Sequence, residues 1–170
     1  MPTLIPQCLR APQSSDYEEL VTWIPDASAC QRWAGSQVPY PLHAETLPQV
    51  LTKTEPGFAS YSAINAHGAL CGFGQHWLRA PDVVHVGRII VAPHGRGQGW
   101  GQALFALLVA AAVQATGAPQ VTLRVYRDNA AAITVYRRWG FREVPALSEP
   151  DVMLMAWRVP VGFPEGHHAL

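Results

Sequence analysis

The sequence has little charge and no net charge. Charged residues make up 14% of its 170 residues, and 12 lysines and arginines balance 12 aspartates and glutamates. Lysine itself is nearly absent, because Lys53 is the only one. A protein that binds nucleic acid or an anionic membrane surface through charge needs an excess of basic residues. The composition therefore predicts that neither nucleic acid nor a membrane is a partner.

Cysteine is equally scarce, and long apolar runs are missing. Cys8, Cys30 and Cys71 are scattered, odd in number and without CxxC spacing, which is unlike a disulfide framework. No stretch reaches the roughly 18 apolar residues that a membrane-spanning helix needs. The segment 1–10 has two prolines and no basic stretch before a long apolar one, so it does not resemble a signal peptide. These absences predict a protein of the reducing cytoplasm.

Apolar residues, in contrast, are abundant. They make up 49% of the chain, which excludes intrinsic disorder for most of it, and the length suits one domain with one core. We expect residues 1–161 to form this single domain. The segment 162–170 contains a proline, two glycines and two adjacent histidines, and we expect it to be a flexible tail.

Proline positions and apolar periodicity divide the chain into a helical first third, a run of strands, and an alternation of strands and helices. Short helices are predicted near residues 15–24, 26–35 and 47–51. Strands are predicted over Phe58–Ile64, Leu70–Leu78, Val83–Val91, Val121–Tyr126, Phe141–Val144 and Val152–Val159, and longer helices over Gln102–Thr116 and Asn129–Trp139. Strands in succession followed by strand–helix–strand units imply an α+β or mixed α/β fold.

A glycine-rich loop lies between the strand that ends at Val91 and the helix from Gln102. Glycines allow successive amides to face inward, and a helix N-terminus adds a partial positive charge, so this segment is suited to phosphate oxygens. The glycine spacing does not match the dinucleotide fingerprint, and the loop has no lysine for a P-loop. The loop therefore predicts a phosphate ligand other than those two nucleotide classes.

The pattern Arg96-x-x-Gly99-x-Gly101 resembles the acetyl-CoA loop of the GNAT superfamily of N-acetyltransferases. A second block, from Val125 to Phe141, is similar to that family's next motif. The resemblance is strong from about residue 83 to 144. It implies a mixed, mostly antiparallel sheet of about six to seven strands with a splayed parallel pair, flanked by helices.

The same resemblance implies how acetyl-CoA binds as the cosubstrate. Backbone groups of Ile89, Ile90 and Val91 would pair with the pantetheine arm between the splayed strands. Main-chain amides of the loop would hold the pyrophosphate and Arg96 would add charge, with Asn129 and Tyr136 on one face of the following helix. The loop amides are those of Gly97, Gln98, Gly99, Trp100 and Gly101.

The resemblance also places the chemistry. Tyr136 lies where the family has the general acid that protonates the departing thiolate, with core packing as the alternative role. His85 lies where many members have a glutamate and is the candidate base, with deprotonation by water as the alternative. A strand amide near Ile90 or Val91 would stabilise the oxyanion. Four arginines that flank this region could contact the 3′-phosphate of CoA or be ordinary solvated residues: Arg124, Arg127, Arg137 and Arg138.

The predicted function is therefore N-acetyl transfer from acetyl-CoA to a primary amine, which is a small molecule or a peptide. No cysteine lies at a nucleophile position in the two blocks, which favours direct transfer in a ternary complex. The alternative is a non-catalytic acyl-CoA-binding or regulatory module on the same fold. Histidine and cysteine spacing predicts no metal site. A homodimer is compatible with the family, and the identity of the amine stays open.

Overall fold

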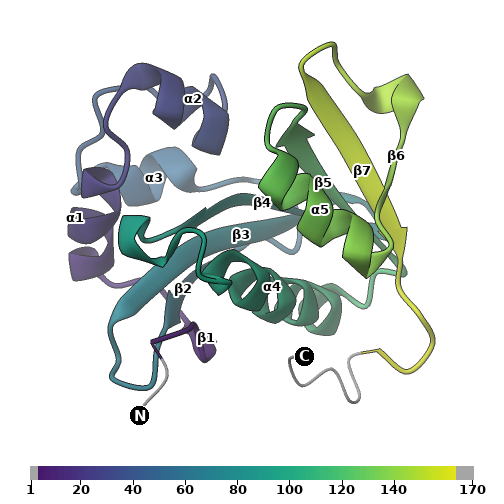
Figure 1. Ribbon diagram of the computed structural model, residues 1–170, viewed down its shortest axis with the longest axis horizontal. Helices are drawn as coiled ribbons and strands as arrows, with labels where there is room; N and C mark the ends of the chain where they lie inside the picture. Colours follow the sequence, from purple (N-terminus) through teal and green to yellow (C-terminus); the bar gives the residue numbers. More distant parts are fainter. Residues whose placement is uncertain (1–3, 164–170) are drawn as a thin grey trace.

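The computed structural model describes residues 4–163 and builds them around a seven-stranded sheet (Figure 1). The strand order is β1-β2-β3-β4-β5-β7-β6, and β4 with β5 is the parallel pair among antiparallel neighbours. The strands are β1 (Cys8–Arg10), β2 (Ala59–Ile64), β3 (Leu70–Ala80), β4 (Val83–Val91), β5 (Gln120–Tyr126), β6 (Arg142–Glu143) and β7 (Val152–Arg158). The expected mixed, mostly antiparallel sheet is confirmed.

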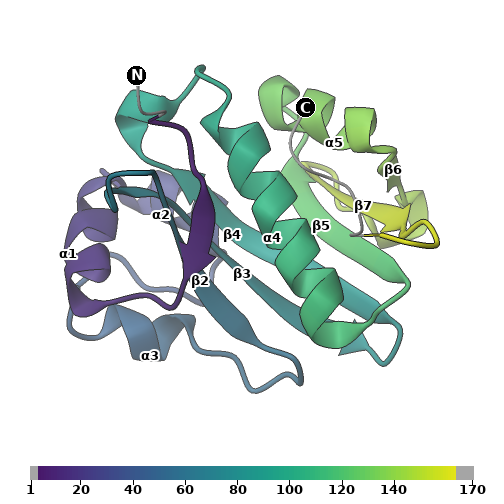
Figure 2. The same cartoon turned by 90° about the horizontal axis from the view of Figure 1, so that it is seen from below.

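Helices cover both faces of this sheet (Figures 1 and 2). On one face lie α1 (Ser14–Thr22), α2 (Ala27–Ala34) and α3 (Leu47–Leu51); on the other lie α4 (Trp100–Thr116) and α5 (Ala130–Trp139). Each face has its own apolar core. The α4 core includes Val84, Leu108 and Val121, whereas the core under α1 to α3 includes Leu20 and Phe73.

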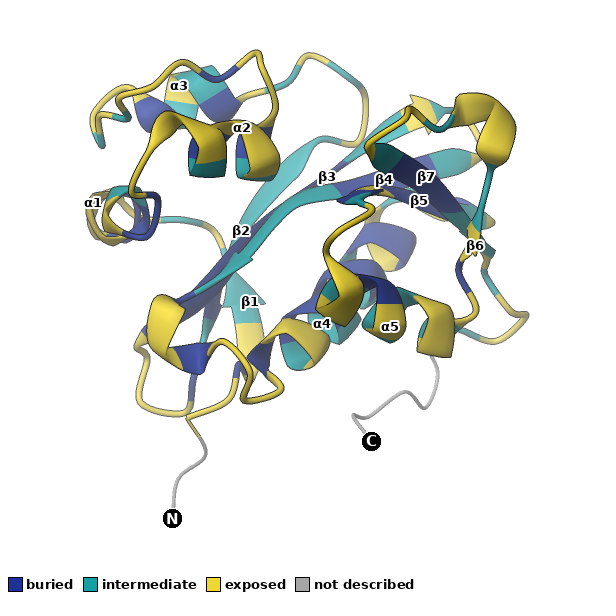
Figure 3. Ribbon diagram, turned by 45° about the horizontal axis from the view of Figure 1, so that its top comes forward, coloured by how far each residue is buried: buried dark blue, intermediate teal, exposed yellow. Residues whose placement is uncertain are grey.

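Burial follows the role of each helix (Figure 3). Helix α4 has seven buried residues, as expected for the nearly all-apolar stretch that forms it, whereas Ile133 is the one buried residue of α5. Alternation along β4 directs Val84 and Val86 toward α4, and His85 toward the face covered by α1 to α3. We call this second face the α1–α3 face.

Most predicted elements are present, with small shifts at their ends. The helix expected from residue 15 begins at Ser14, because Gln13 is its N-cap and forms a capping box with Asp16. Three elements are missing from the predictions: the edge strand β1 and two short 3-10 helices, over Pro93–Gly95 and Pro145–Leu147. Each is only three residues long, which is too short to show a periodic pattern.

The parallel strands separate soon after they meet. Val83, Val84 and His85 are the only β4 residues that pair with β5, although β4 continues to Val91. On its other side β4 stays paired with β3 as far as Val91. The splayed pair that the resemblance implies is therefore present, and it leaves one edge of the last residues of β4 unpaired.

A β-bulge interrupts β4 where the two strands separate. Gly87 pairs with Gln75 and Ile90 pairs with Phe73, so Arg88 and Ile89 together lie opposite Gly74. Arg88 has a φ of 52° and is the one residue other than glycine with a positive φ in the described part of the chain. A left-handed conformation is uncommon for such a side chain and marks a position that surrounding contacts hold in place.

Within residues 4–163 no helix combines the length and apolar character needed to cross a membrane. Of the tail predicted over 162–170, residues 164–170 lie outside the described part of the chain. Cys30 and Cys71 are buried in the core under α1 to α3, as small apolar residues would be, and Cys8 is exposed.

Candidate active site

The glycine loop ends in a helix N-terminus whose first amides are available. A 3-10 turn over Pro93–Gly95 leads into four turn residues, and α4 begins at Trp100. Ala103 donates to the Gly99 carbonyl at 3.2 Å and is the first amide of α4 to bond back to the loop. The amides of residues 100–102 precede it and, as in any first helical turn, have no intrahelical acceptor.

The loop glycines leave room beside the backbone. Gly97 and Gly99 have φ values of 75° and 81°, which favour glycine, whereas Gly101 has no such requirement. A Cβ atom built on any of the three would meet no atom within 4 Å. Glycine at position 101 therefore has no conformational or packing reason within the protein, and close approach of a ligand supplies one.

Glycine at position 95 has a different reason. A Cβ there would come within 2.1 Å of the Trp100 ring, which is buried in the core under α1 to α3. The Trp100 side chain thus anchors the start of α4, and its contribution to the loop is its main-chain amide. The Gln98 side chain likewise turns back, donating to the His94 carbonyl at 2.6 Å.

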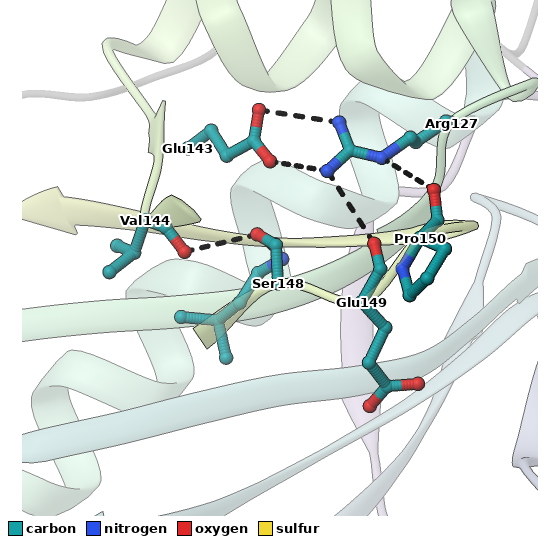
Figure 4. A network of polar contacts seen from close by, with 7 residues as sticks. Arg127, Glu143, Val144, Ser148, Glu149 and Pro150 are labelled. Carbon is teal, nitrogen blue, oxygen red and sulfur yellow. Dashed lines mark hydrogen bonds and ion pairs between the residues drawn. The ribbon is translucent and has the colours of Figure 1, made fainter. Parts of the chain in front are cut away.

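The arginines around the loop have different surroundings. Arg96 is exposed and forms no ion pair with any residue in 4–163. Arg127 donates to Glu143 at 2.6 Å and to the Pro150 carbonyl at 2.9 Å, and so joins the end of β5 to the segment before β7 (Figure 4). Arg124 forms an ion pair with Glu149. Arg96 is therefore the freer partner for a phosphate.

The bulge of β4 is tied to α2 by an indole. Trp33 Nε1 donates a hydrogen bond to the Arg88 carbonyl at 2.8 Å, and the Trp33 ring packs edge-on against Phe73 with 6.1 Å between centroids. The contact fixes the peptide that follows Arg88 in the left-handed bend. The unpaired edge of Ile89, Ile90 and Val91 is thereby held in one orientation next to the point where β4 and β5 separate.

Tyr136 presents a ring in the core and a hydroxyl without a protein partner. The half-buried ring packs against Phe105 and Phe141, with centroid distances of 4.7 and 6.2 Å. No described residue hydrogen-bonds to the hydroxyl. Burial raises the pKa of Tyr136 to about 12, so the phenol keeps its proton at neutral pH. Both roles considered from the sequence, core packing and proton donation, are compatible with this placement.

His85 lies deeper than its predicted role requires. It is 5% exposed, its Nδ1 lies 3.0 Å from the Thr122 hydroxyl, and its ring lies tilted against that of Trp77 with 4.9 Å between centroids. Burial, together with the positive charges of Arg79, Arg124 and Lys53, lowers the pKa of His85 to about 3. The imidazole is neutral at pH 7, but it holds a proton too weakly to remove one readily from an ammonium group.

Asn129 has a structural task at the start of α5. It is the N-cap, and its side-chain oxygen accepts a hydrogen bond from the Ala132 amide at 3.2 Å. It is exposed, and its side-chain NH2 group donates to no described residue. Its predicted contact with the cosubstrate stays a prediction.

The sequence analysis did not single out Arg88, Thr122 or Trp33 as functional residues. Arg88 offered one signal, because an arginine within an otherwise apolar strand end is unusual. The bulge and the Trp33 contact depend on pairing with β3 and on the packing of α2, and no local pattern encodes either.

Comparison with known proteins agrees with this geometry. The family model described as acetyltransferase (GNAT) family matches residues 20–141, which include the loop, the splayed strands and α5. A mycothiol acetyltransferase of Streptomyces avermitilis is 35% identical over 106 residues, covering 59% of this chain and 32% of that protein. The chain thus spans about a third of the length of this relative.

Solved structures share the fold at low sequence identity. Spermidine N-acetyltransferase from Vibrio cholerae, solved with CoA and spermine, superposes with a TM-score of 0.71 at 19% identity, covering 88% of this chain and 94% of that one. A GCN5-related N-acetyltransferase from Kribbella flavida gives a TM-score of 0.68 at 19% identity, with 89% and 96% covered. The chain belongs to the acetyltransferase (GNAT) family, enzymes that use acetyl-CoA as the acetyl donor.

Proposed function

We propose that this protein transfers the acetyl group of acetyl-CoA directly to a primary amine. The observation that carries the proposal is the arrangement at the end of β4. Strands β4 and β5 part after three residue pairs, and the free edge leads into the glycine loop and the first turn of α4, whose amides at residues 100–102 are available. The Gln98 amide, which was expected to bind the pyrophosphate, instead donates to the Gly95 carbonyl at 3.2 Å. Both the mycothiol and the spermidine enzymes are acetyltransferases by name, which supports an amine acceptor of some kind.

The residues present fit acetyl-CoA. The open space beside Gly97, Gly99 and Gly101 and the first-turn amides of α4 suit a pyrophosphate, which the helix dipole favours. Arg96, exposed and without an ion pair in the described residues, adds a positive charge there. The unpaired edge of β4 from Ile89 to Val91 offers backbone groups to the amide-containing arm.

Two groups of this chain would act on the reacting atoms. A backbone amide near Ile90 or Val91, held by the bulge, would donate to the oxygen that becomes negative when the amine adds. The Tyr136 hydroxyl would donate its proton to the sulfur as the thiolate leaves. A pKa of about 12 keeps this phenol protonated. The apolar surroundings that raise the pKa of the phenol also raise the pKa of the CoA thiol, since both anions lose solvation there.

Deprotonation of the amine is better explained by water than by His85. An amine with a pKa near 10.4 must lose a proton before it attacks. The neutral, buried His85 instead hydrogen-bonds to Thr122, across the last paired rung of β4 and β5. In this proposal His85 holds the point where the strands separate, and solvent accepts the proton.

A His85→Asn variant tests this assignment. Asparagine places a polar group near the position of Nδ1, so the bond to Thr122 can persist. Loss of a general base costs about 10²- to 10⁴-fold in rate. We expect a far smaller loss of kcat, and an unchanged pH profile. A loss of 100-fold or more, largest at low pH, would return His85 to the role of base.

The same variant should also change how the stability of the protein depends on pH. Because the pKa of His85 is about 3 in the folded protein and near 6.5 when unfolded, the unfolded state binds more protons between these values. The free energy of unfolding should therefore fall as the pH drops below about 6.5, and it should fall less steeply in His85→Asn. Urea denaturation from pH 7 to pH 4 measures the difference.

The experiment that tests the function is an amine screen. Purified protein is mixed with acetyl-CoA and single amines, including spermidine, amino acids, amino sugars and peptides, and free thiol is followed with a colorimetric reagent. A reaction without amine corrects for hydrolysis. Thiol release that depends on an amine supports the proposal. If acetyl-CoA binds by calorimetry but no amine is acetylated, the non-catalytic binding module is the better description.

A further inference from the structure

Arg88 is a half-buried cation that forms no ion pair with a carboxylate among the described residues. Its Nη1 donates to the Leu51 carbonyl at 2.7 Å and to Gln75 Oε1 at 3.0 Å, and both acceptors are neutral. The five ion pairs found among residues 4–163 do not include Arg88. Burial lowers the pKa of its guanidinium, and the charge of Glu55, which forms its ion pair with Lys53, offsets this only in part. A charge removed from water in this way is costly unless an anion compensates it.

The contacts of Arg88 use only part of its guanidinium. Both hydrogen bonds come from Nη1, and Nε and Nη2 donate to no residue in the described part of the chain. An arginine that served only to cap the end of α3 at Leu51 would need no more than this one nitrogen. The remaining edge, Nε with Nη2, is the side of an arginine that binds a carboxylate with two parallel hydrogen bonds.

The position of Arg88 links it to the reaction. The residue forms the bulge of β4, and its carbonyl is held by Trp33 directly before the strand edge of Ile89 to Val91. Its side chain lies on the α1–α3 face, since it contacts the end of α3 and Gln75 of β3. Strain in a left-handed residue of this size persists where neighbouring contacts require the side chain to point one way.

Most of the charged groups near His85 and Arg88 on this face are positive, although Glu55 also acts on Arg88. Lys53, Arg79 and Arg124 lie close enough to His85, on the same face, to disfavour its protonation. Glu55 pairs with Lys53 at 3.6 Å, and Glu149 pairs with Arg124. With Arg88, four cations therefore meet two carboxylates. Such a surface attracts an anionic group and repels an acceptor with several ammonium groups.

We propose that the acetyl acceptor is an amine that also carries a carboxylate, and that Arg88 binds this carboxylate through Nε and Nη2. The proposal rests on the proposed N-acetyl transfer and narrows its substrate class to amino acids, peptides with a free C-terminus or related amino carboxylates. The cationic surroundings also favour the neutral, reactive form of the bound amine, because they disfavour a further positive charge. Because the same positive charges repel ammonium groups, we expect polyamines to be poor acceptors.

The test compares matched pairs of amines. Each common amino acid and a set of dipeptides is assayed beside its own C-terminal amide, with spermidine as a polycation. Thiol release gives kcat/KM, and calorimetry on CoA-saturated protein gives binding without turnover. Loss of a charge-assisted, two-point contact should cost about 10- to 100-fold. We expect at least one amino acid or dipeptide to have a kcat/KM higher than that of its C-terminal amide by this factor. The difference should come mainly from a lower KM or Kd.

Three variants complete the test. Arg88→Met keeps much of the length of the side chain and should remove the preference for the acid over its amide, whereas Arg88→Lys should keep part of this preference. Arg158 is an exposed arginine at the end of β7, and Arg158→Met is the control that should keep the full preference. Thermal melting confirms that each variant is folded. If Arg88→Met does not fold, the proposal is tested by comparing the acid-over-amide preference of the wild-type protein with that of Arg88→Lys, which should be smaller.

The outcomes separate this proposal from the proposed function. Acids and amides that react or bind equally well, tighter binding of spermidine, or the absence of any acid that binds would overturn the carboxylate proposal. Binding of acids that depends on Arg88 without acetylation of any amine would support the carboxylate site and contradict the transferase function. Acetylation of amines that lack a carboxylate, unaffected by Arg88→Met, would support the function and overturn the carboxylate site.

Discussion

Gly101→Val is expected to abolish acetyl-CoA binding and to leave the domain folded. The substitution introduces no backbone strain, since Gly101 lacks the positive φ of Gly97 and Gly99. No atom lies within 4 Å of the added Cβ, and valine is more favourable than glycine within a helix. The protein alone therefore tolerates the change, and its cost appears only when a ligand approaches the backbone.

The size of this effect follows from the contacts that would be lost. A branched side chain at the second residue of α4 would prevent a pyrophosphate from reaching the first-turn amides. Each hydrogen bond to a charged group contributes about 1.5–3 kcal/mol, so loss of two lowers affinity by at least about 100-fold. Calorimetric titration with acetyl-CoA measures the affinity, and thermal melting without ligand measures stability.

Ala115→Val is the matched control for this experiment. It adds the same side chain to an exposed position near the other end of α4, away from the glycine loop. We expect its affinity for acetyl-CoA to equal that of the wild-type protein. If folded Gly101→Val binds acetyl-CoA as tightly as Ala115→Val does, the loop does not hold the pyrophosphate and the assignment of the cosubstrate site is wrong. Gly99→Val is a weaker test, because its φ of 81° would strain any side chain.

Local sequence was sufficient to locate this loop. Glycine at positions 97 and 99 is required by the backbone conformation of the turn, and the apolar residues of α4 repeat with helical periodicity. Both signals lie within a few residues of the feature they predict. The mostly apolar residues of β4 likewise predicted a strand, and the strand is present over the same residues, Val83–Val91.

The electrostatics of the site were not predictable in this way. His85 looked like an accessible base because a lone histidine in a strand carries no information about what covers it. Its burial comes from Trp77 on the neighbouring strand and Thr122 across the parallel pair, which is 37 residues away along the chain. The bulge at Arg88 is a matter of register between β3 and β4, which a single strand's pattern does not fix.

Tyr136→Phe is expected to reduce turnover by about 10²- to 10⁴-fold, the usual contribution of a general acid, with little change in stability. The ring contacts with Phe105 and Phe141 remain, and the hydroxyl that is removed has no hydrogen-bond partner among the described residues. Affinity for acetyl-CoA should also change little, so the loss should appear in kcat. Thiol release with an amine from the screen, at saturating acetyl-CoA, measures it.

The control removes the same atom from another packed tyrosine. Tyr17 of α1 is 9% exposed and packs against Phe73, so Tyr17→Phe tests the effect of losing a phenol hydroxyl away from the splayed strands. The pKa of about 12 adds a second criterion: the wild-type rate should show no decline from ionisation of Tyr136 at any pH up to 10. If Tyr136→Phe turns over as fast as Tyr17→Phe, the hydroxyl does not protonate the thiolate. The residue would then act in the packing of α5 against α4, and water would supply the proton to the leaving sulfur.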